Sequence, residues 1–142
     1  MSNARNNEVI AHYKTVNPSL RVPPDWPLLA ARQRALYEAR LNLPVRLFEG
    51  ANVLDVACGT GEFTAMYAQW GAHVDAVEGN ELAAARIRPL FAALGLENRL
   101  GAVQVTELST WAPASASYDF VICQGALHHV ADPADIFRRM VR

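Results

Sequence analysis

A short buried strand followed by a glycine turn and a helical run constrains the fold of this chain most. Residues 53–56 read Val-Leu-Asp-Val, Gly59 and Gly61 follow, and residues 62–70 have the character of a helix. Glycine adopts positive φ and leaves room where a Cβ would strike a bound molecule. The first N–H groups of a helix point toward whatever fills that space. Strand, glycine turn and helix in this order are typical of a ligand-binding corner of an open α/β sheet.

Two acidic residues beside this turn indicate the kind of ligand that it suits. Asp55 lies near the end of the first strand, and Glu78 closes a second predicted strand over residues 72–77. A carboxylate near the turn repels a diphosphate and attracts an ammonium or sulfonium group. An acid about 20 residues after the turn is placed to accept both ribose hydroxyls. The pair therefore suits a nucleoside joined to a cationic amino acid, which describes S-adenosylmethionine.

Three segments resemble the motifs of class I S-adenosylmethionine-dependent methyltransferases of the small-molecule type. Residues 53–61 (VLDVACGTG) resemble the first motif, residues 74–78 (VDAVE) the second, and residues 118–130 (YDFVICQGALHHV) the segment around the fourth strand. The resemblance implies an α/β Rossmann-like fold, with an open, mostly parallel sheet of strand order 3-2-1-4 flanked by helices. It also implies S-adenosyl-L-methionine as cofactor and S-adenosyl-L-homocysteine as product.

The candidate cofactor-binding residues follow the predicted strands, because the carboxyl ends of parallel strands meet at one edge of a sheet. Asp55 is expected to act on the methionine ammonium, directly or through water, and Glu78 to hold the ribose. The resembled family places an acid after the third strand for the adenine amino group, and here both Thr106 and Glu107 are open candidates. The full candidate set is Asp55, Ala57, Cys58, Gly59, Thr60, Gly61, Glu78, Gly79, Asn80, Thr106, Glu107 and Gln124.

The adjacent histidines His128 and His129 are the candidates for catalysis. Neighbouring residues on a helix point about 100° apart, so the two rings cannot both face one metal ion, and no metal site is expected. The resemblance places this Leu-His-His segment beside the transferred methyl group. One histidine could act as a general base or orient the acceptor, since histidine titrates near neutral pH. A structural hydrogen bond at the mouth of the cleft is the alternative.

The predicted elements divide the chain into a helical N-terminal cap segment, residues 1–48, and an S-adenosylmethionine-binding domain, residues 49–142. We expect a helix over 28–43, a helix over 81–94 capped by Asn80, and strands over 100–105 and 120–123. Pro89 should kink or split the second of these helices. A further helix should begin after Asp132, which is followed by Pro133.

Composition limits the partners and the location. The net charge is −1 and the pI near 6.4, so a nucleic-acid backbone is not the favoured partner. No apolar run approaches the ~20 residues that cross a bilayer, so we expect no membrane partner and a cytoplasmic location. Cys58 and Cys123 are expected to be reduced packing residues.

The chain stops at Arg142, inside the helix that follows the fourth strand, whereas the resembled family has a seven-stranded sheet. We therefore expect the N-terminal portion of a longer enzyme, or a sheet edge that another chain covers or that self-associates.

The predicted function is methyl transfer from S-adenosylmethionine to a small-molecule acceptor that the sequence does not identify. Two alternatives are a non-catalytic S-adenosylmethionine-binding module and an NAD(P)-binding oxidoreductase domain. Thr64 in place of a third glycine, and Asp55 beside the turn, count against the oxidoreductase.

Overall fold

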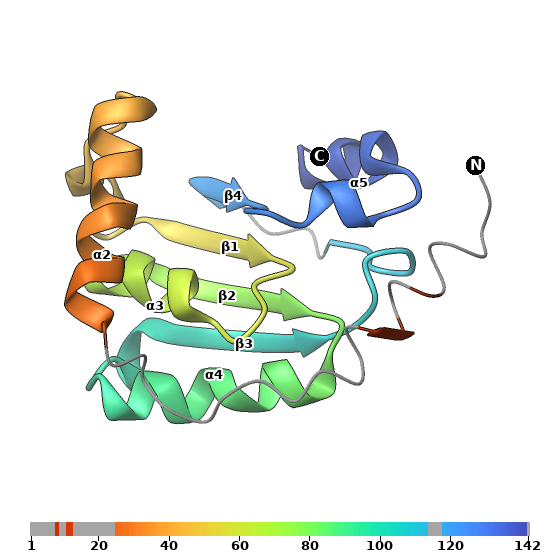
Figure 1. Cartoon of the computed structure of the whole chain (residues 1–142), viewed down its shortest axis with the longest axis horizontal. Coiled ribbons are helices and arrows are strands. Elements are labelled where there is room, and N and C mark those ends of the chain that lie inside the picture. The colour runs from red at the N-terminus through yellow and green to blue at the C-terminus, as the bar shows by residue number, and fades with distance from the viewer. Residues whose placement is uncertain (1–7, 9–10, 13–24, 114–117, 142) are drawn as a thin grey trace.

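The computed structural model describes residues 8, 11–12, 25–113 and 118–141. Its sheet has four parallel strands in the order β3-β2-β1-β4 (Figure 1). The strands are β1 (Asn52–Val56), β2 (His73–Glu78), β3 (Leu100–Val105) and β4 (Phe120–Ile122). The predicted Rossmann-like sheet and its 3-2-1-4 order are confirmed.

The sheet is accompanied by the helices α2 (Trp26–Ala35), α3 (Glu62–Gln69), α4 (Glu81–Ala93) and α5 (Pro133–Met140). Helix α3 connects β1 to β2 and helix α4 connects β2 to β3, as parallel neighbours require, whereas α2 precedes the sheet and α5 follows β4. The helix predicted over 28–43 is shorter, because α2 ends at Ala35 and a π-helical turn, Leu36–Arg40, follows it. Short 3₁₀ turns cover Val45–Phe48, Glu97–Arg99 and Leu127–His129. Within the described residues, no helix has both the length and the apolar character to cross a membrane.

Pro89 lies inside α4 without splitting it. Proline removes one intrahelical hydrogen bond, which costs about 3 kcal/mol in a helix interior. Ile87, Leu90 and Phe91 are buried on both sides of this position. Packing of these side chains against the sheet therefore holds the helix together through the proline.

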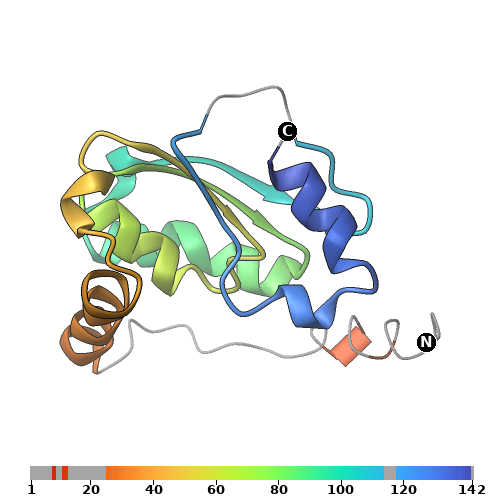
Figure 2. The ribbon, with the colours of Figure 1, turned by 90° about the horizontal axis from the view of Figure 1, so that it is seen from above.

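The face of the sheet under α3 and α4 carries the larger core. Side chains alternate between faces along a strand, and Val53, Val74 and Ala76 point to this side, where α3 and α4 lie next to each other (Figures 1 and 2). Trp26 and Phe48, from the segment before β1, belong to the same core. The division predicted between residues 48 and 49 therefore crosses a shared core, and as a functional boundary it stays a prediction.

The opposite face is covered by less of the chain. Leu54, Val56 and Val77 pack there against Trp111, and Met140 of α5 joins the edge of this cluster. Helix α5 lies beside the ends toward which β1 and β2 point (Figure 1). The carboxyl ends of the strands are therefore enclosed by α5 on one side and by the glycine turn on the other.

Candidate functional site

The turn after β1 takes the left-handed backbone at three positions. The φ angles are +58° at Ala57, +61° at Gly59 and +86° at Gly61. A Cβ at Gly61 would lie 3.0 Å from Cγ1 of Ile87 on α4, whereas a Cβ at Gly59 would meet nothing within 4 Å. Gly61 is thus required by packing between α3 and α4 as well as by its φ, and Gly59 faces open space. Ala57 holds this conformation with a methyl group, which costs roughly 1–2 kcal/mol.

The Glu78 carboxylate joins the turn to the start of α4. Its Oε2 accepts a hydrogen bond from the Gly59 N–H at 2.7 Å, and its Oε1 accepts one from the Asn80 N–H at 2.8 Å. Asn80 caps α4 as predicted, since its Oδ1 accepts from the N–H groups of Leu82 and Ala83. Glu78 is half-buried, so its carboxylate remains accessible from the pocket.

Asp55 lies beneath the turn, in the core on the α3 side. The side chain is 2% exposed, and its Oδ2 accepts a hydrogen bond from the Thr64 hydroxyl at 2.6 Å. Burial raises the pKa of Asp55 to about 7; the Thr64 hydrogen bond opposes this rise and the negative charge of Glu78 adds to it. Thr64, which stands where a dinucleotide turn would have glycine, thus serves as the partner of a buried acid. The predicted action of Asp55 on a ligand ammonium stays a prediction.

The two cysteines are free thiols in buried surroundings. Burial raises the pKa of Cys123 to about 11 and that of Cys58 further, and the nearby negative charge of Asp55 adds to both shifts. Both thiols are therefore protonated at neutral pH and poorly suited to nucleophilic chemistry.

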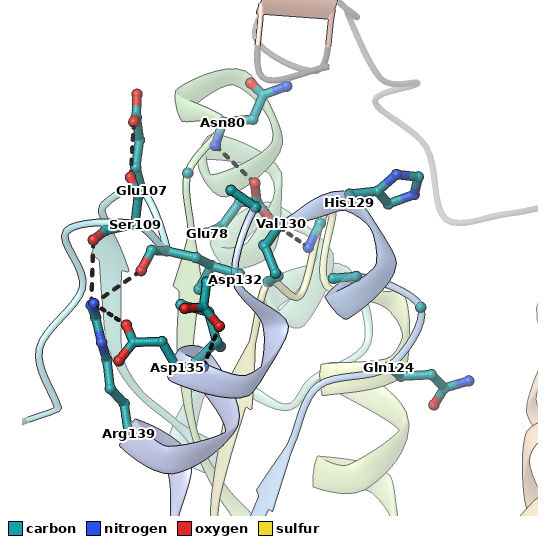
Figure 3. Close-up of a pocket in the computed structure, with 18 of the residues that line it drawn as sticks. Glu78, Asn80, Glu107, Ser109, Gln124, His129, Val130, Asp132, Asp135 and Arg139 are labelled. Atoms are coloured by element: carbon teal, nitrogen blue, oxygen red, sulfur yellow. Dashed lines mark hydrogen bonds and ion pairs between the residues drawn. The ribbon is translucent and has the colours of Figure 1, made fainter. Parts of the chain in front are cut away.

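A cavity of about 380 Å³ opens at the carboxyl ends of the strands. This volume is in the range of small-molecule sites. The turn after β1 and the start of α4 form its floor, the loop after β3 forms one wall, and the segment after β4 with α5 forms the other (Figure 3). The lining residues are Ala57, Gly59, Glu78, Gly79, Asn80, Ala83, Glu107, Leu108, Ser109, Gln124, Gly125, Ala126, His129, Val130, Ala131, Asp132, Asp135, Ile136 and Arg139.

The structure brings part of the predicted set to this cavity. The predicted residues that line it are Ala57, Gly59, Glu78, Gly79, Asn80, Glu107, Gln124 and His129. The other predicted residues are not part of the lining, and they are Asp55, Cys58, Thr60, Gly61, Thr106 and His128. Of the two candidates after β3, Glu107 lines the cavity and Thr106 does not. The binding role of each residue stays a prediction.

The two histidines differ in their surroundings. They occupy the 3₁₀ turn Leu127–His129 with ring centroids 3.8 Å apart. His129 lines the cavity, whereas His128 is exposed. Among the described residues, no group of three His, Cys, Asp or Glu side chains is placed to hold a metal ion.

Helix α5 supplies charged residues that the sequence did not assign to the site. Asp132 caps α5, as predicted, by accepting from the Asp135 N–H at 2.8 Å, and both acids also line the cavity. The Arg139 guanidinium donates to the Trp111 carbonyl at 2.6 Å, reaches the carbonyls of Leu108 and Ser109, and forms an ion pair with Asp135 (Figure 3). Arg139 therefore fastens α5 to the loop after β3, an arrangement for which the sequence carries no local signal.

An open parallel sheet with a glycine turn, a second-strand acid and a cavity at the strand ends defines an α/β nucleoside-binding class of protein. A family model for a methyltransferase domain matches residues 28–142. The chain belongs to this methyltransferase domain family.

Ubiquinone biosynthesis O-methyltransferases from several bacteria are similar to part of the chain. The ubiquinone biosynthesis O-methyltransferase of Bordetella avium is 39% identical over 92 residues, which are 63% of this chain and 36% of that protein. The protein of the same name from Stutzerimonas stutzeri is 35% identical over 91 residues, 63% of this chain and 38% of that protein. The matched region thus spans little more than a third of these curated relatives.

A solved structure shows the same fold at greater length. Magnesium protoporphyrin IX methyltransferase from Synechocystis PCC 6803, crystallised with bound S-adenosylmethionine, superposes with a TM-score of 0.67. The alignment covers 98% of this chain and 73% of that one at 17% sequence identity. At this identity the likeness concerns the fold alone.

Proposed function

We propose that the cavity binds S-adenosyl-L-methionine and that the chain takes part in methyl transfer to a small molecule. The observation that carries this proposal is the charge of the lining. Among the described residues, four acids line the cavity, Glu78, Glu107, Asp132 and Asp135, against the single guanidinium of Arg139. Such a lining attracts a sulfonium and an ammonium group and repels a diphosphate. The acidic lining therefore favours S-adenosylmethionine over the nicotinamide dinucleotide that an oxidoreductase domain would bind.

Glu78 is the residue best placed to hold the ribose. Each of its oxygens accepts one backbone N–H, and a carboxylate oxygen has a further acceptor site that a hydroxyl can use. The two backbone bonds fix the carboxylate between the turn and α4, so it is oriented before a ligand arrives. Glu107, on the wall after β3, is the matching candidate for the adenine end.

The bound cofactor supplies an electrophilic methyl group on a positively charged sulfur. The chain contributes position and electrostatics, because the thioether leaving group is already activated by its charge. His129 lines the cavity and is the residue that we assign to the proton of the acceptor. We place the acceptor atom as a hydroxyl oxygen, on the support of the relatives that are named O-methyltransferases.

A non-catalytic binding module is the second candidate. The matched region spans 36% and 38% of the two curated relatives, so residues of the acceptor side in those proteins can lie outside it. Binding and turnover are therefore tested separately.

The binding test is titration calorimetry with S-adenosylhomocysteine and with NAD. We expect binding of the first ligand only. Glu78→Ala should weaken it by about 1–3 kcal/mol, because ribose hydroxyls lose a buried acceptor. Glu81→Ala, which removes an exposed acid three residues further along, is the matched control. Equal affinity in the Glu78 variant and the control would refute the assignment.

The turnover test uses labelled S-adenosylmethionine with a catechol, an amine and a thiol as probe acceptors. We expect label on the catechol oxygen, and loss of about 100-fold or more in rate for His129→Ala, the usual contribution of a general base. His128→Ala, the exposed neighbour, should keep the rate. Ligand binding without transfer to any probe would favour the non-catalytic module.

A further inference from the structure

A partly buried chain of hydrogen bonds between uncharged side chains connects helix α2 to the segment after β4. Gln33 of α2 is 4% exposed, and its Nε2 donates to Oε1 of Gln124 at 2.7 Å. Nε2 of Gln124 returns a bond to Oε1 of Gln33 at 3.3 Å. The Tyr67 hydroxyl of α3 donates to the same Gln124 oxygen at 3.1 Å and accepts from the Tyr37 hydroxyl at 3.1 Å. Residues 91 positions apart in sequence are thus joined in both directions.

These bonds hold the Gln124 amide at both of its ends. A carbonyl oxygen has two lone pairs, and Gln33 and Tyr67 use both of them on Oε1 of Gln124. The Nε2 of Gln124 meanwhile donates to Oε1 of Gln33, so both ends of the amide are bonded. Burial raises the pKa of Tyr67 far above its ordinary value, so its hydroxyl remains a donor at neutral pH. The Gln124 amide is therefore held by three hydrogen bonds, to residues of α2 and α3.

Gln124 contributes to the cavity while its side chain is anchored elsewhere. It lines the cavity together with Gly125 and Ala126, and the turn that carries His129 follows directly. Its side chain points away from the carboxylates of Glu78 and Asp132 (Figure 3). Gly125 has a φ of +75° and a Cβ there would meet nothing within 4 Å, so this glycine offers little packing to hold the segment. Among the described residues, the Gln124 amide gives the segment a polar attachment to α2 and α3.

We propose that Gln33 is a positioning residue, which holds Gln124 and thereby fixes residues 124–129 against the bound ligand. Helix α2 is then a supporting part of the site, although it contributes no residue to the lining. The proposal rests on the proposed function for the identity of the ligand. The position of the segment itself does not depend on that identity.

The experiment measures S-adenosylhomocysteine affinity by calorimetry and hydrogen exchange of residues 124–129 by mass spectrometry. Gln33→Leu keeps the size of the side chain and removes its polarity. We expect affinity to fall about 3–10-fold, because both hydrogen bonds between Gln33 and Gln124 are lost, and exchange of the segment to become faster. Gln69→Leu, a change of the same kind at an exposed position of α3, should alter neither quantity.

A double-variant cycle separates positioning from a general structural role. If Gln33 acts through Gln124, the double variant Gln33→Leu/Gln124→Leu should bind no more weakly than Gln124→Leu alone. Additive losses would overturn the proposal. It would also be overturned if Gln33→Leu lowered only the melting temperature, with affinity and exchange unchanged.

Tyr67→Phe serves as a second variant if Gln33→Leu does not fold. It removes one of the two donors to Gln124 and should weaken affinity about 2–3-fold. Tyr118→Phe is its control, because the Tyr118 hydroxyl donates to Asp75 away from the cavity lining. Equal effects of the two variants would count against the network. Absence of ligand binding by the wild-type protein would refute the proposed function, and hydrogen exchange of the ligand-free variants would still decide the positioning role.

Discussion

On the face of the sheet covered by α2, α3 and α4, the Phe48 ring stacks on both Tyr67 and Phe120, whereas on the other face a smaller apolar cluster and the hydrogen bonds of Arg139 hold α5 in place. The Phe48 centroid lies 5.5 Å from that of Tyr67 and 4.7 Å from that of Phe120, with nearly parallel planes. On the other face Arg139 ties α5 to the carbonyls around Trp111. Opening the packed face requires that the apolar core be disrupted. The few hydrogen bonds that hold α5 can break in a local opening that leaves the rest of the fold intact. The floor of the cavity is therefore expected to be rigid and its α5 wall to be the movable one.

Phe48→Ala should give the largest loss of stability. Phe48 is fully buried and also contacts the rings of Tyr37 and Trp70 edge-on, so its truncation leaves a cavity among four aromatic side chains. We expect a loss of about 5 kcal/mol in the free energy of unfolding, at the upper end of the range for buried phenylalanine. Urea denaturation measures it. Phe137→Ala, at a position 56% exposed, should cost under about 1 kcal/mol, and a similar cost at both positions would contradict the comparison.

Asp55→Asn tests the single buried acid of the packed face through the pH dependence of stability. The folded-state pKa of Asp55, about 7, lies above its ordinary value of 3.8. The native state therefore keeps a proton that the unfolded chain has released, and this contribution is present below pH 4 and lost as pH rises to 7. It amounts to at most on the order of 4 kcal/mol. Asp55→Asn should remove this fall in stability, measured by urea denaturation between pH 4 and 8.

Asp25→Asn, at an exposed position, is the control for this series and should leave the pH profile of the wild type unchanged. A profile of Asp55→Asn that runs parallel to that of the wild type would show that Asp55 ionises normally in the fold.

Arg139→Met should have the smallest effect on global stability and a distinct local one. The variant keeps an apolar stem against the cluster but removes the bonds to the loop after β3. We expect a loss of about 1–2 kcal/mol and faster hydrogen exchange in residues 106–112. Arg138→Met, an exposed neighbour on the same helix, is the matched control. Unchanged exchange in the loop would show that the α5 wall does not depend on this arginine.

The features that the sequence predicted are those encoded locally. The run of apolar residues and the positions of the glycines predict the strand, turn and helix around Gly59. The side chains of Asn80 and Asp132 cap the helices that follow them. The parallel sheet follows from the alternation of strands and helices, and its observed strand order is the one that the family resemblance implied. These features depend on neighbours within a few residues, or on rules of topology.

The features that the sequence did not predict depend on tertiary proximity. The motif position of Asp55 does not tell whether its carboxylate faces a ligand or Thr64. The packing of α3, which carries Thr64, determines that the carboxylate accepts from the Thr64 hydroxyl. Arg139 binds backbone carbonyls, which every residue has, so no pattern in the sequence marks its partners. Gln33 and Gln124 are ordinary polar residues until the fold places them together. The cavity floor could therefore be predicted, and its α5 wall and the α2 attachment could not.

Ala57 adds a carbon atom to the lining of the cavity at a position where its backbone conformation favours glycine. The floor is narrower there by one methyl group than it would be with hydrogen, beside the Gly59 amide that any ligand of the turn approaches. A molecule seated on this turn must be complementary in outline to that methyl. We therefore expect Ala57 to discriminate by shape among ligands of similar charge.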